Sequence, residues 1–279
     1  LVVWLLGISW QMPFIVIGLI GILWILGWFA LYRPLHEHPH VTEEERGYIL
    51  RHQAEERSPD AGEKVRWIDV IKIRQVRGVV LTRFFMDPIW WFYTFWLPTY
   101  FMTDRGVDLK KMAAFTTLSF LASDLGNLFG GWASSSLVKR GFSINRARKT
   151  VMVPCAILMM VGLAVPFVQI SVAVPLIALV MFCYQSWSVN MMTIPADVLP
   201  KNVVGSAAGL SHMGAGFGGI AINWLTGKLA QQFGSFTGPI MLMGIMPIIG
   251  ITFLFLVIGR IASFDNPVEG AKEAALQEV

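Results

Sequence analysis

The sequence has little charge and little cysteine, and both shortages narrow the possible class of protein. Only 14% of the 279 residues are charged, whereas 55% are hydrophobic and the mean hydropathy is +0.59. A soluble domain carries about 25% charged residues. Cys155 and Cys183 both fall in apolar stretches and predict no disulfide framework. The composition therefore indicates an all-α membrane protein that crosses the bilayer several times.

Motifs that carry common enzyme chemistry are also missing from the sequence. It contains no nucleotide-binding glycine loop, no catalytic-triad spacing and no metalloprotease signature, so nothing argues for an enzyme or a cofactor. No cysteine or compact ligand pattern accompanies the histidines after residue 32, so we expect solvated loop residues and no metal site. Membrane topology explains the net charge of +4 better than nucleic-acid binding does. These histidines are His36, His38, His40 and His52.

Two parts precede the main apolar block. The chain begins with Leu1 inside an apolar run, with neither an initiator Met nor a signal peptide, so we expect a piece of a longer protein. Residues 1–7 predict the end of one span, 9–13 a turn and 14–32 a complete span. Residues 33–78 predict a polar linker with short amphipathic helices, in which the Thr-Glu-Glu-Glu run at 42–45 is typical of a helix N-terminus.

A block of six further spans occupies residues 79–260, and a polar tail follows at 261–279. The loop at 139–149 carries five positive charges and no acid. By the positive-inside rule this loop, the linker and the C-terminal tail are cytoplasmic, and an even number of spans agrees with that orientation. The six predicted spans are 79–102, 112–137, 150–168, 174–199, 203–226 and 238–259.

Paired prolines suggest an internal repeat of three plus three helices. The first span of the block contains Pro88 and Pro98, and the fourth contains Pro175 and Pro195. Proline removes a backbone donor and bends a helix, so paired breaks indicate where a pathway can open. The alternative is that prolines are simply common in membrane helices.

Two carboxylates at membrane depth are candidates for proton coupling. Asp87 lies near the middle of its span, with Trp91 at i+4 and Thr94 at i+7 on the same face. It either has a function or forms a structural pair with a basic residue from another helix. Asp124 belongs to a polar stripe that we expect to face the bundle interior. The stripe either relays protons or contacts solute, or it holds helices together beside the close-packing glycines Gly126, Gly130 and Gly131.

Residues 182–224 contain the candidate solute contacts. Trp187 and Asn190 form an aromatic and amide pair of the kind that stacks on a sugar ring and binds its hydroxyls. His212 aligns with Gly216, Gly219 and Asn223 on a helix whose glycines let another helix approach closely. The alternatives are ordinary packing for Trp187 and a backbone-bonded interior histidine for His212.

Several strings resemble the C-terminal half of a major facilitator superfamily transporter, in particular the anion:cation symporter family and its bacterial hexuronate branch. They lie at 24–49, 83–101 (RFFMDPIWWFYTFWLPTYF), 123–132 (SDLGNLFGGW), 137–149, 184–201 and 203–219. The resemblance implies one bundle of a 12-helix transporter, preceded by the last one to two helices of the N-terminal bundle.

The resemblance also implies a mechanism and site residues. It implies proton-coupled uptake of a hexuronate across the bacterial inner membrane by alternating access, with the N-terminal bundle handling the carboxylate and the C-terminal bundle the hydroxyl end. Other organic anions (aldonate, aldarate or tartrate-like) and a non-transporting membrane sensor are the alternatives. The expected partners are a small organic anion, a proton, the lipid bilayer and the missing bundle. The resemblance places Trp187 and Asn190 on the pathway-facing part of the family's tenth helix, and His212 where relatives often have asparagine. Together with Trp91 and Asn223, which share helix faces with Asp87 and His212, these residues are the predicted solute contacts.

Overall fold

A computed structural model describes residues 9, 11–37, 41–55, 66–199 and 201–258. The chain divides into two units, Leu1–Gly62 and Glu63–Val279, and each is considered by itself. The span end predicted at 1–7, the tail at 261–279, and His38 and His40 lie outside the described residues. Every regular element among the described residues is helical, which confirms the all-α prediction.

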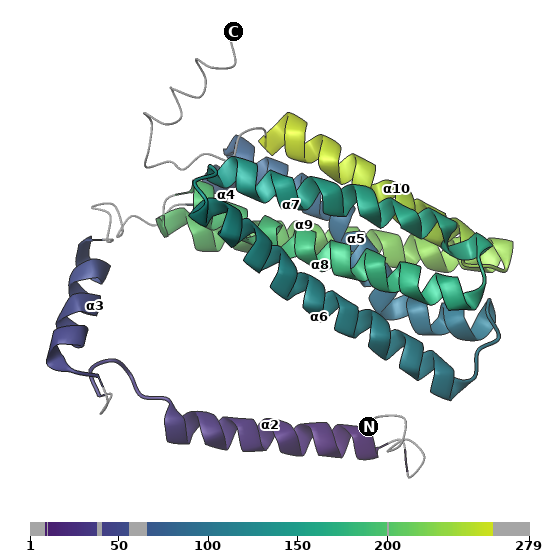
Figure 1. Ribbon diagram of the computed structural model, residues 1–279, viewed down its shortest axis with the longest axis horizontal. Helices are drawn as coiled ribbons and strands as arrows, with labels where there is room; N and C mark the ends of the chain where they lie inside the picture. Colours follow the sequence, from purple (N-terminus) through teal and green to yellow (C-terminus); the bar gives the residue numbers. More distant parts are fainter. Residues whose placement is uncertain (1–8, 10, 38–40, 56–65, 200, 259–279) are drawn as a thin grey trace, which may run out of the picture. The chain divides into compact units, whose positions relative to one another are not determined.

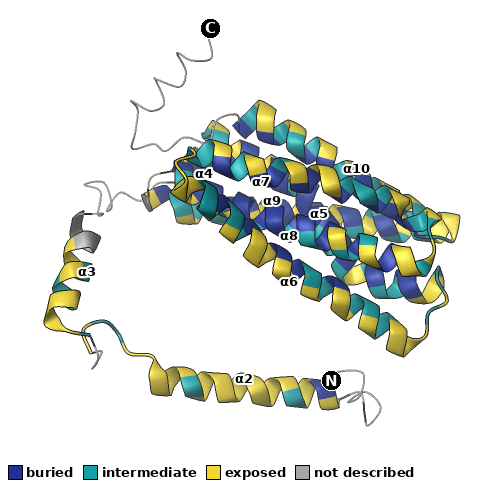
Figure 2. Cartoon of the chain, in the orientation of Figure 1, coloured by how far each residue is buried: buried dark blue, intermediate teal, exposed yellow. Residues whose placement is uncertain are grey.

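The first unit contains α2 (Met12–Leu31) and α3 (Glu43–Glu55). Helix α2 has 20 residues, the length that a hydrocarbon core of about 30 Å requires. It is apolar on all sides and exposed within its unit, with only Pro13 buried (Figure 2). The side chain of Thr42 accepts a hydrogen bond from the backbone N–H of Glu45 at 3.2 Å, so the helix start predicted at 42–45 is confirmed.

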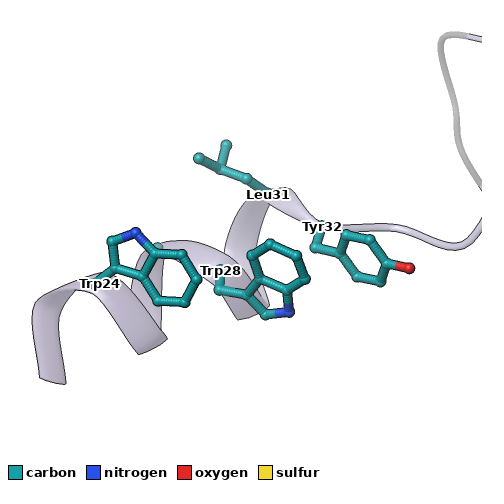
Figure 3. A pocket seen from close by; sticks show the side chains of 5 residues that line it. Trp24, Trp28, Leu31 and Tyr32 are labelled. Carbon is teal, nitrogen blue, oxygen red and sulfur yellow. The ribbon is translucent and has the colours of Figure 1, made fainter. Parts of the chain in front are cut away.

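A ladder of aromatic rings runs along the last turns of α2. Trp24 stacks on Trp28 with ring centroids 5.4 Å apart, and Trp28 stacks on Tyr32 at 4.5 Å (Figure 3). The rings recur every four residues and therefore share one face. Trp and Tyr are typical of the membrane–water boundary, so this face predicts where α2 leaves the bilayer.

The second unit is a helical bundle, and the six predicted spans lie within its helices to within one residue. Helix α5 is longer than its span predicted, because it continues through the charged residues Arg74 and Arg77. The elements are α4 (Trp67–Lys72), α5 (Arg74–Thr103), α6 (Leu109–Lys139), α7 (Ile144–Met159) with the 3-10 helix η1 (Met160–Phe167), α8 (Ile170–Val198), α9 (Lys201–Phe233), and α10 (Thr237–Phe253) with the π-helical turn η2 (Leu254–Ile258).

Four described helices are both long and apolar enough to cross a membrane: Met12–Leu31, Ile144–Phe167, Ile170–Val198 and Thr237–Ile258. Helices α5, α6 and α9 have 30, 31 and 33 residues, which is ample length at about 1.5 Å per residue. These three helices are less apolar than the other four because they contain polar residues and glycines. Helix α5 also contains tryptophans and prolines. Such residues are retained where a membrane helix faces protein or water instead of lipid.

Two helix pairs form the closest contacts of the bundle, α6 against α8 and α5 against α9 (Figure 1). A Cβ added to Gly126 would lie 2.1 Å from the carbonyl oxygen of Phe182, and one at Gly130 would lie 2.4 Å from that of Ser186. The expected close packing at these two glycines is confirmed. It is wrong for Gly131, which has no heavy atom within 4 Å of its added Cβ.

The same arrangement recurs between α9 and α5. Gly214 and Gly218, four residues apart, approach Val80 and Phe84, and a Cβ on Gly218 would lie 2.2 Å from the Phe84 carbonyl oxygen. In each case the middle helix of one group of three packs through two glycines on the first helix of the other group. This is the contact pattern expected of a three-plus-three repeat.

The paired prolines lie inside continuous helices. Helix α5 runs through Pro88 and Pro98, and α8 runs through Pro175 and Pro195, without an interruption in either helix. The expected breaks at these positions are therefore absent from the described helices. Neighbouring helices satisfy the backbone groups that a proline leaves free in such positions.

The basic loop is tied to the bundle through Arg148 in α7. Its guanidinium donates to Asp197 Oδ2 at 3.1 Å, to Ser134 Oγ at 2.9 Å and to Asn190 Oδ1 at 3.2 Å. These partners belong to α8 and α6, so one cation connects the adjacent ends of three helices. Arg148 therefore holds the ends of these helices together.

Candidate functional site: a charged cavity between α5, α8 and α9

A cavity of about 270 Å³ lies between α5, α8 and α9. Its volume is near the lower end of the range for small-molecule pockets, which suits a compact solute. It combines two charged groups, a tyrosine hydroxyl and an imidazole with two indole rings. The lining residues are Arg83, Asp87, Trp90 and Trp91 from α5, Tyr184, Gln185, Ser188 and Met192 from α8, and His212 and Ala215 from α9.

Arg83 and Asp87 form a buried ion pair at the cavity wall. They lie four residues apart on one face of α5, and their exposed fractions are 4% and 3%. Arg83 Nε and Nη2 donate to Asp87 Oδ2 at 2.9 and 2.7 Å. An isolated charge at this depth is very costly, and the contact between the two charges offsets part of that cost.

Two other helices complete the coordination of this pair. Arg83 Nη1 lies 3.3 Å from Ser211 Oγ on α9, and the hydroxyl of Tyr184 on α8 donates to Asp87 Oδ1 at 3.1 Å. Every nitrogen of the guanidinium and both oxygens of the carboxylate therefore have a protein partner. The pair thus connects the three helices that enclose the cavity.

His212 is an exposed residue that lines the same cavity. Its Nδ1 lies 2.8 Å from the carbonyl oxygen of Ala208. A carbonyl can only accept, so Nδ1 carries a proton and Nε2 of the neutral ring is left as an acceptor. The predicted backbone bond is therefore present, but the histidine is not an interior one.

Trp91 links this cavity to a second one of about 490 Å³, which Asn223 also lines. The Asn223 amide already has partners, because Trp96 Nε1 donates to its Oδ1 at 2.8 Å and its Nδ2 donates to the Gly219 carbonyl at 2.8 Å. The structure brings Asp87, Trp91 and His212 together around one cavity. It places Asn223 beside the neighbouring cavity.

Trp187 does not line either cavity, and its expected role as a stacking platform is wrong. The side chain is fully buried, with an exposed fraction of 0%, and it contacts the ring of Tyr184 at a centroid distance of 6.3 Å. A solute cannot reach a ring enclosed in this way. The alternative of ordinary core packing describes it correctly.

Asn190 is also fully buried and serves the contact between helices. Its Nδ2 donates to the carbonyl oxygens of Gly130 on α6 and Ser186 on α8, at 3.0 and 2.8 Å, and its Oδ1 accepts from Arg148. The amide has no group left to offer a solute. The predicted solute contact at Asn190 is therefore wrong in this structure.

Asp124 lies on an exposed face of α6, so the prediction that its polar stripe faces the bundle interior is wrong for this bundle. Thr117, Asn127 and Ser135 share that exposure. The helix buries a different face, on which close contact with α8 requires small side chains. That buried face consists of Ser119, Ser123, Gly126, Gly130 and Ser134.

Sequence reasoning missed Arg83 and Tyr184 as cavity residues, although the spacing of Arg83 from Asp87 is a recognisable i, i+4 pair. Asp87 was expected to pair, if at all, with another helix, yet its cation comes from its own helix. On α8, Gln185 and Ser188 belong to the 182–224 stretch that was expected to contain the solute contacts, and both line the cavity.

Within the described residues, no group of three or more His, Cys, Asp or Glu side chains could hold a metal ion.

The cavity residues are acceptors, donors and aromatic rings whose chemistry suits a polar anion. A guanidinium favours a carboxylate, and indole rings offer apolar faces to a sugar ring.

The burial of Trp187 leads to a testable separation of stability from binding. We expect Trp187→Phe to lower the melting temperature, because a smaller ring leaves a cavity that costs about 1–3 kcal/mol, while the affinity for solute stays within about twofold. Trp91→Phe, at a half-buried cavity residue, should instead weaken binding with little change in melting temperature. Thermal unfolding and equilibrium binding of both variants test this pair of outcomes, and an unstable Trp91→Phe with normal affinity contradicts it.

Comparison with known proteins identifies the family of the chain. Residues 1–210 match the sequence profile of the Major Facilitator Superfamily. The chain belongs to this superfamily. It is 31% identical to the hexuronate transporter of Escherichia coli strain K12 over 284 residues, covering 99% of this chain and 65% of that relative.

Two further relatives have related names. The chain is 30% identical to the hexuronate transporter of Bacillus subtilis strain 168, over 93% of this chain and 62% of the relative. It is 26% identical to the D-galactonate transporter of Escherichia coli O6:H1, over 91% of this chain and 60% of the relative. The chain therefore spans 60–65% of the length of these three superfamily members.

Proposed function

We propose that this superfamily member is part of a secondary active transporter that carries a sugar-acid anion, with a hexuronate preferred, by proton-coupled symport and alternating access. The observation that carries the proposal is the buried guanidinium of Arg83 at the wall of a solute-sized cavity. The names of the relatives support the same class of solute. A bacterial inner membrane is the location that we infer from these relatives.

The cavity residues divide between the two ends of such a solute. Arg83 binds the carboxylate, because a guanidinium presents parallel N–H groups that match its two oxygens. Gln185, Ser188 and the free Nε2 of His212 bind hydroxyl groups, and the Trp91 ring covers an apolar face of the sugar. This assignment differs from the expectation that this bundle contacts only the hydroxyl end.

A second bundle completes the transporter in this proposal. It covers the exposed polar face of α6 that includes Asp124, and it also covers the apolar cavity beside Asn223. Asp124 and Asn223 then lie at the interface between the two bundles, which move relative to each other during transport. The linker, the 139–149 loop and the C-terminal tail then face the cytoplasm. Alternating access follows from rocking of the two bundles about the solute.

Among sugar acids, the cavity favours a solute with one carboxylate. Among the described residues that line it, one guanidinium, that of Arg83, is the only arginine or lysine side chain. A second carboxylate, as in an aldarate, would be buried there without a cation. An aldonate has one carboxylate and is the closest competitor, in agreement with the similarity to a D-galactonate transporter.

Uptake of radiolabelled galacturonate into vesicles that contain the full-length protein tests the proposal. We expect accumulation above the external concentration with an inward proton gradient, and only equilibration without it. Unlabelled glucuronate should compete strongly, galactonate less and galactarate least. Uptake equal to that of protein-free vesicles for all four acids would contradict the proposed function.

A further inference from the structure

Three of the five N–H groups of Arg83 already donate to protein acceptors, which raises the question of which edge a solute carboxylate takes. The edge formed by Nε and Nη2, the geometry that grips a carboxylate in bidentate fashion, is occupied by Asp87 Oδ2. The third nitrogen faces Ser211. A solute carboxylate therefore takes this edge only when Asp87 leaves it.

The charge balance of the site restricts what happens to Asp87 next. In the structure one buried cation faces one buried anion, at exposed fractions of 4% and 3%. A solute anion that displaces Asp87 would leave two carboxylates and one guanidinium in a poorly hydrated site. An unpaired buried carboxylate is costly enough that it takes up a proton instead.

The surroundings of Asp87 allow the neutral acid to stay hydrogen-bonded. The Tyr184 hydroxyl donates to Oδ1 in the ionised state, and because a hydroxyl also accepts, it can receive the proton of a neutral Asp87. The ionisable groups that act on Asp87 are Arg83 on its own helix, Tyr184 on α8 and His212 on α9. The sequence of α10, which also packs on α5, has no ionisable side chain.

We propose that the solute carboxylate and Asp87 compete for the same edge of Arg83, so that each bound anion brings one proton onto Asp87. The proposal rests on the proposed function and supplies its coupling step within this bundle. One O–H bond forms on Asp87 and one O–H bond breaks in the hydronium ion that supplies the proton, so a water molecule is released and nothing is oxidised or reduced. The site is neutral before and after, with Arg83 paired first to Asp87 and then to the solute.

The exchange has a definite pH dependence. Binding of the anion consumes one proton, so the affinity rises about tenfold for each unit that the pH falls, over the range in which Asp87 is ionised in the free protein and neutral in the complex. Asp87→Asn imitates the neutral acid and removes the competitor. This variant is expected to bind the anion with an affinity that does not vary with pH and that exceeds the wild-type affinity at pH 8.

Calorimetric titration of the full-length protein with galacturonate tests the exchange. Titrations at pH 6, 7 and 8 in two buffers of different ionisation enthalpy give the number of protons bound per anion. We expect one for the wild type and zero for Asp87→Asn. His212→Gln should bind more weakly but still take up one proton, which separates Asp87 from the imidazole as the acceptor.

Asp69→Asn is the matched control. Asp69 belongs to an exposed pair in which Lys72 Nζ lies 2.8 Å from its Oδ1, and the hydrogen bond from Lys72 lowers the pKa of Asp69. It is therefore ionised throughout the pH range of the titrations, and its loss should leave the proton count at one. Loss of a carboxylate from an ion pair outside the cavity should therefore leave proton uptake unchanged.

The outcomes separate this inference from the function on which it rests. Wild-type binding without proton uptake overturns the exchange, and so does binding to Asp87→Asn with uptake of one proton. Neither result contradicts the proposed transport function. Binding of no sugar acid by the folded wild type overturns the proposed function and the exchange together. The wild-type proton count needs no variant, so a count of zero overturns the exchange even if Asp87→Asn does not fold.

Discussion

Replacement of Arg83 by glutamine is expected to reduce sugar-acid affinity by a factor of about 30 to several thousand. Within the part of the chain that the structure describes, the guanidinium is the only arginine or lysine side chain that lines the cavity, and it has an exposed fraction of 4%. Loss of one partner of a buried charge pair costs about 2–5 kcal/mol in binding, and 1.4 kcal/mol corresponds to a factor of ten. Equilibrium binding of galacturonate to the purified variant measures the loss.

A second variant separates binding from folding in this experiment. Arg83→Gln leaves Asp87 buried without its cation, which destabilises a protein by about 3–5 kcal/mol. The double variant Arg83→Gln with Asp87→Asn removes both charges, so its melting temperature should recover towards the wild type. Its affinity should not recover, because no cation remains for the carboxylate. A stable double variant with wild-type affinity would show that the solute does not use Arg83.

Gly126→Ala is expected to abolish the native packing of α6 on α8. The added Cβ would lie 2.1 Å from the carbonyl oxygen of Phe182, and backbone cannot move aside as the end of a flexible side chain can. Overpacking of a well-packed site costs about 1–3 kcal/mol and more where backbone must shift. Thermal unfolding monitored by size-exclusion chromatography should show a large drop in melting temperature or no folded protein.

Gly131→Ala is the matched control on the same helix. Its added Cβ has no heavy atom within 4 Å, and alanine favours a helix over glycine by about 1 kcal/mol. This variant should be as stable as the wild type or slightly more stable. Equal melting temperatures for the two alanine variants would contradict the close contact between α6 and α8.

The helices of the bundle could be predicted from the sequence because hydropathy reports lipid-sized apolar runs directly. Their ends could not, because a helix continues after the apolar run stops. Helix α5 begins at Arg74, five residues before the predicted start at 79, and α9 ends at Phe233, seven residues after the predicted end at 226. Charged and polar residues at those ends lie outside the part that hydropathy detects.

The orientation of each helix about its axis could be predicted only where one face is polar. On α5, Asp87 and Trp91 lie on the cavity face as expected. On α8, polar residues occur on two faces: Gln185 and Ser188 line the cavity, whereas Ser186 and Asn190 face α6. Polarity alone cannot distinguish a solute contact from a contact between helices, since hydrocarbon satisfies neither.

The polar stripe of α6 also shows that polarity alone does not predict which face of a helix is buried. Asp124 was expected inside because a carboxylate avoids lipid, but the glycine and serine face of α6 takes the buried position. Close approach to α8 needs small residues, and this requirement decides the orientation of the helix within the bundle. The choice depends on the surface of the neighbouring helix, which the sequence of α6 does not contain.

A structure of the full-length protein with galacturonate bound is the measurement that tests this account most directly. The account predicts the solute carboxylate at the Nε and Nη2 edge of Arg83, with oxygens about 2.8 Å from the nitrogens. Asp87 should then be turned away from the guanidinium, and the sugar hydroxyls should lie near Gln185, Ser188 and His212. Galacturonate bound elsewhere, with the contact between Arg83 and Asp87 intact, would contradict it.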